Sequence, residues 1–180
     1  MKTLRISHPA FSGIHREETI TFYRDLLGMA IVLRQDNLDF PSEEHLFFHI
    51  GDDNFIAYFV PKEGADLSIY KPAQPGSGWM DHLAIDFELD ELEAMRDRLV
   101  AAGVEVEGPI DRGYERSIYF KDPNGIMIEL LAWLTPVPHG LTQADVLRSA
   151  QQLREKRGAA LIEDEDVRMA IRTLNHLQRM

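Results

Sequence analysis

The 180-residue chain contains no cysteine. This absence excludes disulfides, zinc–thiolate sites and thiol nucleophiles, and it is typical of a protein from the reducing cytoplasm. Basic residues are also few, because 19 Lys and Arg stand against 30 Asp and Glu and the formal net charge is −11. Since phosphate binding needs clustered cations, we expect no nucleic-acid partner.

Long apolar runs are missing as well. No stretch approaches the roughly 20 apolar residues that a membrane span needs, and the first residues lack the apolar segment of a signal peptide. We therefore expect a cytoplasmic protein that does not contact a membrane. The content of 44% hydrophobic and 27% charged residues is ordinary for a globular protein, long enough for one buried domain or two small modules.

The chain repeats one pattern, and a histidine opens each copy. His8 precedes Gly28 by 20 residues, and His82, which lies 74 residues after His8, precedes Gly103 by 21 residues. Between each histidine and its glycine lies an amphipathic helical segment, for which the glycine is a suitable C-cap. Such a repeat predicts two similar modules, with the two histidines in equivalent places.

Each copy predicts the element order βαβββ. The copies cover about residues 4–60 and 79–133, with helices at Glu17–Leu27 and from Asp90 to Gly103. The expected strands are Leu4–Ile14, Met29–Arg34, His45–Ile50 and Phe55–Val60 in the first copy, and Asp81–Phe87, Val104–Val106, Ser117–Lys121 and Ile126–Leu131 in the second. This predicts an α+β fold in which the two modules form a curved mixed sheet around a cup.

Residues 136–180 predict a C-terminal helical extension to the domain of residues 1–135. Thr142 can cap a helix that ends before Gly158, and a second helix begins at about Asp164. The second helix carries one apolar stripe, made of Val167, Ala170, Ile171, Leu174 and Leu177. The stripe must be buried against the sheet domain or a partner. We expect a homodimer contact, with a lid over the cup as the alternative.

Three side chains predict a metal site in the cup. His8 and His82 open the two modules, and side chains alternate along a strand, so each histidine can point away from the helix-packed face. Glu129 lies in an otherwise apolar strand, where an unpaired carboxylate is costly to bury. Two imidazoles and one carboxylate form the ligand set of non-haem Fe(II) enzymes, with Mn(II) as the next choice.

Each of these residues also has an ordinary structural interpretation. A single histidine on a strand is more often a hydrogen-bonded structural residue than a ligand. Glu129 could pair with Arg112 or Arg116 instead of a cation. The equivalent placement of the two histidines, together with Glu129, favours the metal.

These features resemble the vicinal oxygen chelate superfamily. The resemblance rests on the paired βαβββ pattern, on His8 and His82, and on the segments Phe22–Gly28 and Asp122–Glu129. The superfamily includes lactoylglutathione lyases, fosfomycin-modifying transferases, methylmalonyl-CoA epimerases, type I extradiol dioxygenases and metal-free bleomycin-binding proteins. It implies a divalent metal at the three residues named above, with Fe(II) favoured, Mn(II) next, and Zn(II) or Ni(II) as alternatives.

Details within the superfamily point to one reaction class. Lactoylglutathione lyases have a fourth metal ligand from the first module. The residue of the first module that corresponds to Glu129 is Tyr58, which has no carboxylate. We therefore expect three protein ligands here. Tyr119, ten residues before Glu129, falls where extradiol dioxygenases have an active-site tyrosine, although packing alone also explains it. Those enzymes have an acid–base histidine where this chain has Asn54, and His49 is the nearest substitute.

The resemblance therefore implies a metal-dependent enzyme for a small substrate that chelates the ion through neighbouring oxygens. We expect an extradiol-type dioxygenase of a catechol-like compound, with Tyr119, Asn54 and His49 as catalytic residues. The alternatives are a glyoxalase-like lyase or isomerase, or a fosfomycin-type transferase, at the same site. A non-catalytic protein that sequesters an aromatic ligand is a further alternative, although an apolar cup would not need the histidines and Glu129.

Overall fold

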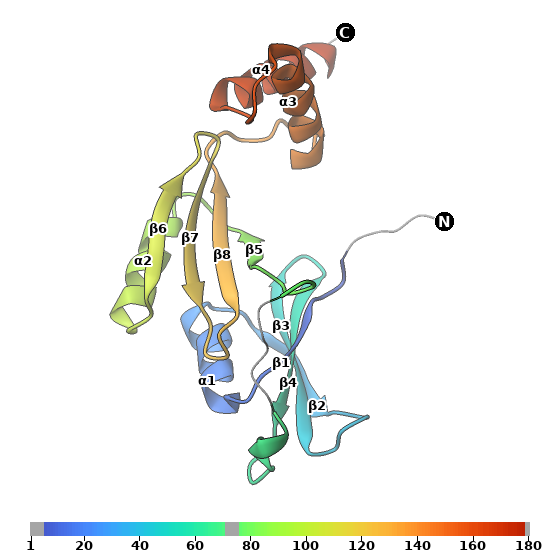
Figure 1. The fold of residues 1–180 in the computed structure, drawn as a ribbon, viewed down its shortest axis with the longest axis vertical. Coiled ribbons are helices and arrows are strands. Elements are labelled where there is room, and N and C mark those ends of the chain that lie inside the picture. The colour runs from blue at the N-terminus through green and yellow to red at the C-terminus, as the bar shows by residue number, and fades with distance from the viewer. Residues whose placement is uncertain (1–5, 71–75, 179–180) are drawn as a thin grey trace. The chain divides into compact units, whose positions relative to one another are not determined.

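The computed structural model describes residues 6–70 and 76–178, and its elements follow the predicted order (Figure 1). The first module contains β1 (Ala10–Ser12), α1 (Arg16–Ile20) with its π-helical continuation η1 (Thr21–Leu26), β2 (Ile31–Asp36), β3 (Glu43–Gly51) and β4 (Asn54–Pro61). The second contains β5 (Leu83–Asp86), α2 (Leu92–Ala101), β6 (Val106–Asp111), β7 (Glu115–Lys121) and β8 (Met127–Trp133). A 3₁₀ turn, η2 (Leu67–Ile69), lies between the modules, and α3 (Gln143–Arg157) and α4 (Asp164–Gln178) follow them.

Each module forms one four-stranded sheet, and the two sheets have the same strand order. The orders are β1-β4-β3-β2 and β5-β8-β7-β6. In the first sheet β1 runs parallel to β4, while β4, β3 and β2 pair in antiparallel fashion. The predicted α+β fold with two βαβββ modules and a helical hairpin is confirmed.

The bounds of several predicted strands differ from those in the structure, including β1 and β6. The first strand was expected from Leu4 to Ile14, but β1 pairs only over Ala10–Ser12; the start of the expected strand lies outside the described residues. β6 extends to Asp111, well beyond the expected end at Val106.

Two compact units make up the chain. Unit 1 consists of the described residues within Met1–Leu83, Asp97–Glu105 and Phe120–Ile128, and unit 2 of those within Ala84–Arg96, Val106–Tyr119 and Glu129–Met180. Among the described residues, no helix has the length and apolar character needed to cross a membrane.

The core of unit 1 lies between the first helix and one face of the first sheet. Tyr23 from η1 contacts the rings of Phe48 and Tyr58, and all three side chains are almost fully buried. Leu46 and Ile56 alternate with outward-pointing neighbours on β3 and β4 and complete this face. The period of two along each strand thus separates a helix-packed face from a second, partly exposed face.

The β7–β8 turn belongs to unit 1 and holds the start of α1. The Asn124 side-chain oxygen accepts from the backbone N–H groups of Ile14 (2.9 Å) and His15 (3.2 Å), and its amide donates to Thr19. A Cβ at Gly13 would lie 2.7 Å from the Asn124 side-chain oxygen, so this approach requires glycine. A residue more than 100 positions away therefore supplies the N-terminal cap of α1.

Asp122 in the same turn anchors a buried polar cluster. One of its carboxylate oxygens accepts from the hydroxyls of Tyr58 and Tyr23. The other accepts from the backbone N–H groups of Asn124 and Ile126, which closes the turn. Burial raises the pKa of both tyrosine hydroxyls well above the usual value, so they remain donors.

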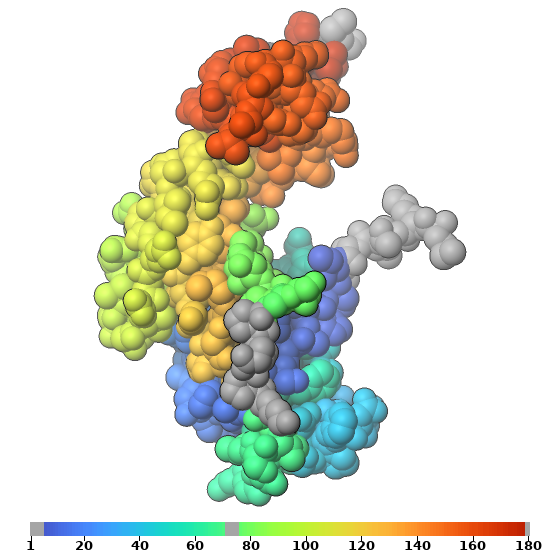
Figure 2. All heavy atoms as spheres, in the orientation of Figure 1, coloured from blue at the N-terminus to red at the C-terminus, as the bar shows by residue number. Residues whose placement is uncertain are grey.

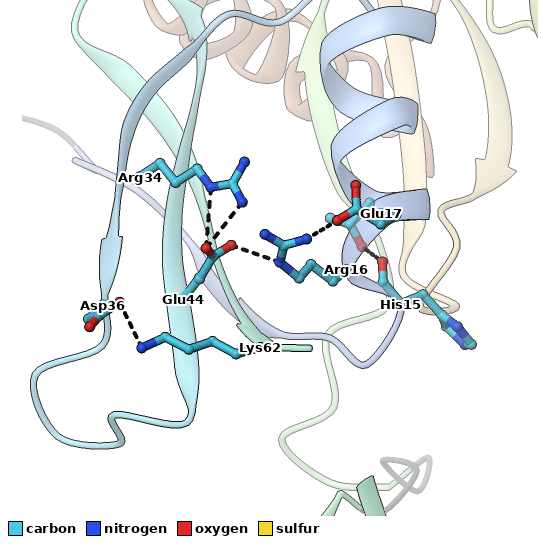
Figure 3. A network of polar contacts seen from close by, with 8 residues as sticks. His15, Arg16, Glu17, Arg34, Asp36, Glu44 and Lys62 are labelled. Carbon is cyan, nitrogen blue, oxygen red and sulfur yellow. Dashed lines mark hydrogen bonds and ion pairs between the residues drawn. The ribbon is translucent and has the colours of Figure 1, made fainter. Parts of the chain in front are cut away.

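Ion pairs join α1 to the neighbouring strands (Figure 3). The Glu44 carboxylate on β3 accepts from Arg16 of α1 at 2.8 Å and from Arg34 of β2 at 3.1 Å. Burial opposes ionisation of Glu44, but the two guanidinium groups outweigh it and lower the pKa of the carboxyl.

The C-terminal helices pack most of the predicted stripe within unit 2, while Leu177 stays 60% exposed. Thr142 and Asp145 form a reciprocal capping box at the start of α3, and Gly158 ends that helix in the left-handed conformation, as predicted. The hairpin core consists of Val146, Ala150, Val167 and Ala170. Tyr114 and Trp133 from the sheet region pack against it, and Figure 2 shows the two helices as one packed lobe.

Candidate functional site

Glu129 and Tyr119 lie together on neighbouring strands of unit 2. Glu129 on β8 is 4% exposed, and the hydroxyl of Tyr119 on β7 donates to its Oε1 atom. This is the cross-hairpin proximity that the ten-residue spacing suggests. Burial, and then the hydrogen bond to Glu129, raise the pKa of the Tyr119 hydroxyl, so the tyrosine is protonated at neutral pH.

Further charged groups surround this pair. Tyr119 raises the pKa of the Arg112 guanidinium on the β6–β7 turn. Burial, and then the negative charge of Glu129, raise the pKa of Glu115 on β7. Arg116, the other cation considered for Glu129, pairs instead with Asp111 at 3.0 Å.

Both predicted histidine ligands have a hydrogen bond at Nδ1. His82 directly precedes β5, and its Nδ1 lies 2.9 Å from the carboxylate of Asp81. Because a carboxylate accepts, Nδ1 carries the proton, and a neutral imidazole then has its lone pair on Nε2. The Nδ1 atom of His8 lies 3.1 Å from the Ser7 hydroxyl. Metal-binding imidazoles usually have such a partner on the other nitrogen.

The donor set therefore fits a divalent transition metal in chemistry. Two imidazoles with engaged Nδ1 atoms and one buried carboxylate match the expected ligand types. Within residues 6–70 and 76–178, however, no three His, Asp or Glu side chains are gathered closely enough to hold an ion. His8 and His82 belong to unit 1, and Glu129 belongs to unit 2.

The two further catalytic candidates lie at the β3–β4 turn. The His49 Nε2 atom lies 2.7 Å from the Asp52 carbonyl, so Nε2 is the donor in this contact. The Asn54 side-chain amide donates to the Gly51 carbonyl at 3.4 Å. Both side chains thus contribute to the turn, and their catalytic roles stay predictions.

The partly exposed face of the first sheet is rich in aromatic side chains. We call the rings of His45, Phe47, Phe55 and Phe59 the aromatic face. His45 stacks on Phe59 with ring centroids 4.3 Å apart, and Phe47 contacts both His45 and Phe55. His8 adjoins this face, with its ring centroid 4.8 Å from that of Phe47.

His45 belongs to the aromatic face, and burial, followed by the proximity of His8, lowers the pKa of its imidazole. The alternation of His45, Phe47 and His49 with buried Leu46 and Phe48 was visible in the sequence. It could have identified this face.

Tyr58 does not occupy the position in the first module that was expected to correspond to Glu129 in the second. Its hydroxyl bonds Asp122 and Tyr23, so the side chain points to the helix-packed core. The β4 residues on the other face are Phe55, Ala57 and Phe59, which offer no metal-binding atom. The match to Tyr58 was wrong in register by one residue, which on a strand reverses the face.

Comparison with known proteins places the chain in a superfamily. The profile of the Glyoxalase/Bleomycin resistance protein/Dioxygenase superfamily matches residues 5–130. The chain belongs to this superfamily. The match covers most of both modules, and it confirms the resemblance drawn from the histidines and the turn motif.

Similar superfamily proteins carry the names of different enzymes. A probable lactoylglutathione lyase of Vibrio cholerae is 28% identical over 134 residues, which are 73% of this chain and 92% of that protein. Biphenyl-2,3-diol 1,2-dioxygenase 2 of Rhodococcus globerulus is 36% identical over 61 residues, which are 33% of this chain and 32% of that enzyme. The superfamily therefore indicates an enzyme of this broad group, and the relatives do not agree on one reaction.

Solved structures confirm the fold. The fosfomycin resistance protein FosX of Listeria monocytogenes, complexed with Mn(II) and sulfate, has a TM-score of 0.54 at 20% identity and covers 73% of this chain and 93% of its own. A putative dioxygenase of Bacillus subtilis has a TM-score of 0.62 at 23% identity and covers 78% of this chain and 44% of its own. At these identities the likeness concerns the fold alone.

Proposed function

We propose that the protein is a metal-dependent enzyme for a small substrate that chelates the ion through two neighbouring oxygens. His8, His82 and Glu129 are its metal ligands. The three come together when the two modules pair, either within one chain or across a homodimer. The Mn(II) in the FosX complex supports a divalent metal in this superfamily, and Fe(II) suits the ligand set equally.

The reaction that we favour is extradiol-type oxygenation of a catechol-like compound. The observation that carries this choice is the aromatic face beside His8, because rings of Phe47 and Phe59 offer flat apolar contacts to an aromatic substrate. The biphenyl-diol dioxygenase relative points to the same substrate class.

Each protein residue has a defined part in this proposal. The metal supplies Lewis acidity and a template for the substrate oxygens. Tyr119, protonated at neutral pH, donates a hydrogen bond at the Glu129 side of the site. The aromatic face orients the ring and excludes water. Asn54 can donate a hydrogen bond but cannot move a proton, so His49 is the residue proposed for proton transfer.

A glyoxalase-like lyase or isomerase is the second candidate. It is favoured by the Vibrio cholerae relative, which is matched over 92% of its own length. The β4 residues on the exposed face offer no fourth metal ligand. This favours the reaction classes with three protein ligands over the lyase.

Anaerobic loading of the purified protein with Fe(II), followed by a panel of catechols and oxygen, tests the proposal. We expect near one Fe(II) per chain by metal analysis and a yellow ring-opened product by absorbance. Glu107→Ala, which removes an exposed β6 carboxylate, is the matched control and should behave like the wild type.

Metal binding without turnover of any catechol would overturn the dioxygenase assignment. Methylglyoxal with glutathione should then be tested for lyase activity. A protein that takes up no metal but still binds aromatic ligands would instead be a sequestering protein.

A further inference from the structure

β2 is an open edge of the first sheet. The strand order is β1-β4-β3-β2, so among the described residues only β3 pairs with this strand. Four of the six residues of β2 are exposed, and the strand contains no proline. An edge of this kind presents backbone donors and acceptors to which another strand can bind.

The equivalent edge of the second sheet is built differently. That sheet has the order β5-β8-β7-β6, and β6 contains Pro109 directly after Gly108. Proline has no backbone N–H to donate, and it is one of the residues that protect sheet edges from pairing. The repeat therefore leaves one edge interrupted by proline and the other, β2, open.

Arg34 and Asp36 are residues of β2 whose backbone groups point away from β3. Asn37 donates its N–H to the Glu43 carbonyl at 3.0 Å, and bonded and non-bonded pairs alternate along an antiparallel ladder. Counted back from this bonded pair, Asp36 and Arg34 both occupy non-bonded positions. A strand added at this edge would form its hydrogen bonds with these two residues.

The charges of these residues select one register for a second copy of β2. In an antiparallel pair with its two-fold axis at Gln35, Arg34 of each copy lies opposite Asp36 of the other, and both bond through the backbone. An axis at Arg34 or at Asp36 would place like charges opposite each other. Opposite charges stabilise a directly facing pair and like charges destabilise it, so the first register is favoured.

Both side chains are available for this contact. The Arg34 side chain is 44% exposed and that of Asp36 is 72% exposed. Glu44, which accepts from Arg34, also accepts from Arg16 (Figure 3). Because a guanidinium has five N–H donors, Arg34 can keep its bond to Glu44 and bind a second carboxylate. Asp36 has two carboxylate oxygens, one of which accepts from Lys62 at 2.7 Å.

We propose that the chain forms a two-fold symmetric homodimer through β2, which joins two four-stranded sheets into one sheet of eight strands. The proposal goes beyond the proposed function and involves no metal. The same register directs Val32 of each copy towards Leu38 of the other, just beyond the end of the strand. These residues are 53% and 88% exposed in the single chain, and their burial adds to the backbone hydrogen bonds.

Charge reversal on the full chain tests the proposal, with sedimentation velocity over a range of protein concentrations as the measurement. We expect the wild type to be a dimer. Arg34→Asp and Asp36→Arg should each weaken dimerisation at least about tenfold, because each puts like charges at both facing pairs. Glu107→Arg, which reverses an exposed charge on β6, is the matched control and should stay as dimeric as the wild type.

An equimolar mixture of Arg34→Asp and Asp36→Arg separates this interface from any other. In the mixed pair, both facing positions again have opposite charges, so the mixture should form a heterodimer about as tightly as the wild type forms its homodimer. Loss of folding in either variant would not produce this recovery. Circular dichroism of each variant alone checks the fold.

Hydrogen exchange of the wild type gives a second, independent readout. The backbone N–H groups of Arg34 and Asp36 should exchange more slowly at high than at low protein concentration, because only the dimer bonds them.

Four results would overturn the inference. These are a wild type that stays monomeric, a dimer that neither charge reversal weakens, a mixture of folded variants that stays monomeric, and exchange at these two N–H groups that does not depend on concentration. None of these measurements involves metal or substrate, so the proposed function stands or falls separately.

Discussion

The two modules share one strand order but have different chemistry on their strand faces. In the first module, the face opposite the helix carries Phe47, Phe55 and Phe59, in contact with one another or with His45. In the second, Glu129 and Tyr119 form a hydrogen-bonded pair with charged neighbours. A repeated fold thus carries an aromatic surface in one copy and a polar network in the other.

This difference shows how a repeat can divide a task. A histidine stands just before the first strand of each sheet, as His8 and His82 show, while the other residues on the strand faces differ between the two copies. We infer that the first module contributes substrate contacts and the second contributes the carboxylate.

The largest effect is expected for Glu129→Ala. Removal of the only carboxylate among the three proposed ligands should lower Mn(II) affinity by at least about 100-fold, beyond what loss of an outer partner costs. Circular dichroism and the melting temperature should show an intact fold. Full metal occupancy in this variant would refute the ligand assignment.

A mixture of two variants tells how the modules pair. His8→Ala and Glu129→Ala should each bind no metal alone. If the modules pair across a homodimer, mixed dimers regain one intact site, and metal analysis of a co-expressed mixture detects it. If they pair within one chain, the mixture stays metal-free.

Asp122→Ala should cause the largest loss of stability. It leaves two buried tyrosine hydroxyls and two turn N–H groups without their acceptor, and charged hydrogen bonds of this kind contribute about 1.5–3 kcal/mol each. We expect the free energy of unfolding, from urea denaturation, to fall by about 3 kcal/mol or more. Asp122→Asn should recover part of this loss. A change below that of an exposed Asp90→Ala control would contradict the role of the cluster.

Phe47→Ala should weaken substrate binding to a smaller extent. Loss of one aromatic contact is expected to cost about 1 kcal/mol, which corresponds to roughly a fivefold weaker affinity for 4-nitrocatechol in the metal-loaded protein. Phe40→Ala, at a 64% exposed position before β3, is the matched control. Equal affinities in both variants would show that the aromatic face does not contact the ring.

The smallest effect concerns Glu44 and acid stability. Its pKa is lowered in the folded state, so its contribution to stability is present above the ordinary glutamate value of 4.5 and is lost as pH falls through the folded pKa. Glu44→Gln should melt slightly lower than the wild type at pH 7, and the two should converge in acid. A melting difference that persists at pH 2 would contradict this ion-pair mechanism.

Local signals predicted the helices and the topology well. The Thr142 cap and the glycine after α3 mark its ends because capping depends on neighbouring residues. β6 was predicted too short because Gly108 and Pro109 are typical strand breakers, and here the strand continues through them. β6 is the edge strand of its sheet, with only β7 beside it among the described residues, and an edge strand tolerates a proline.

The candidate site was only partly predictable. The Tyr119–Glu129 contact follows from hairpin spacing, whereas the hydrogen bond between His82 and Asp81 depends on side-chain rotamers that the sequence does not specify. Arg112 was considered as a direct partner of Glu129, and the structure shows Tyr119 as a hydrogen-bond donor to that carboxylate. The direction in which a side chain points from a turn cannot be derived from the hydrophobic periodicity of the sequence.

The cap that Asn124 provides to α1 has a consequence for biosynthesis. The first helix depends on a residue 110 positions later in the chain, so its N-terminus stays uncapped on the ribosome until the β7–β8 turn has emerged. A gene fragment that encodes the first module alone would therefore express a first helix whose N-terminus lacks its cap, so this module depends on the second one to complete its folding.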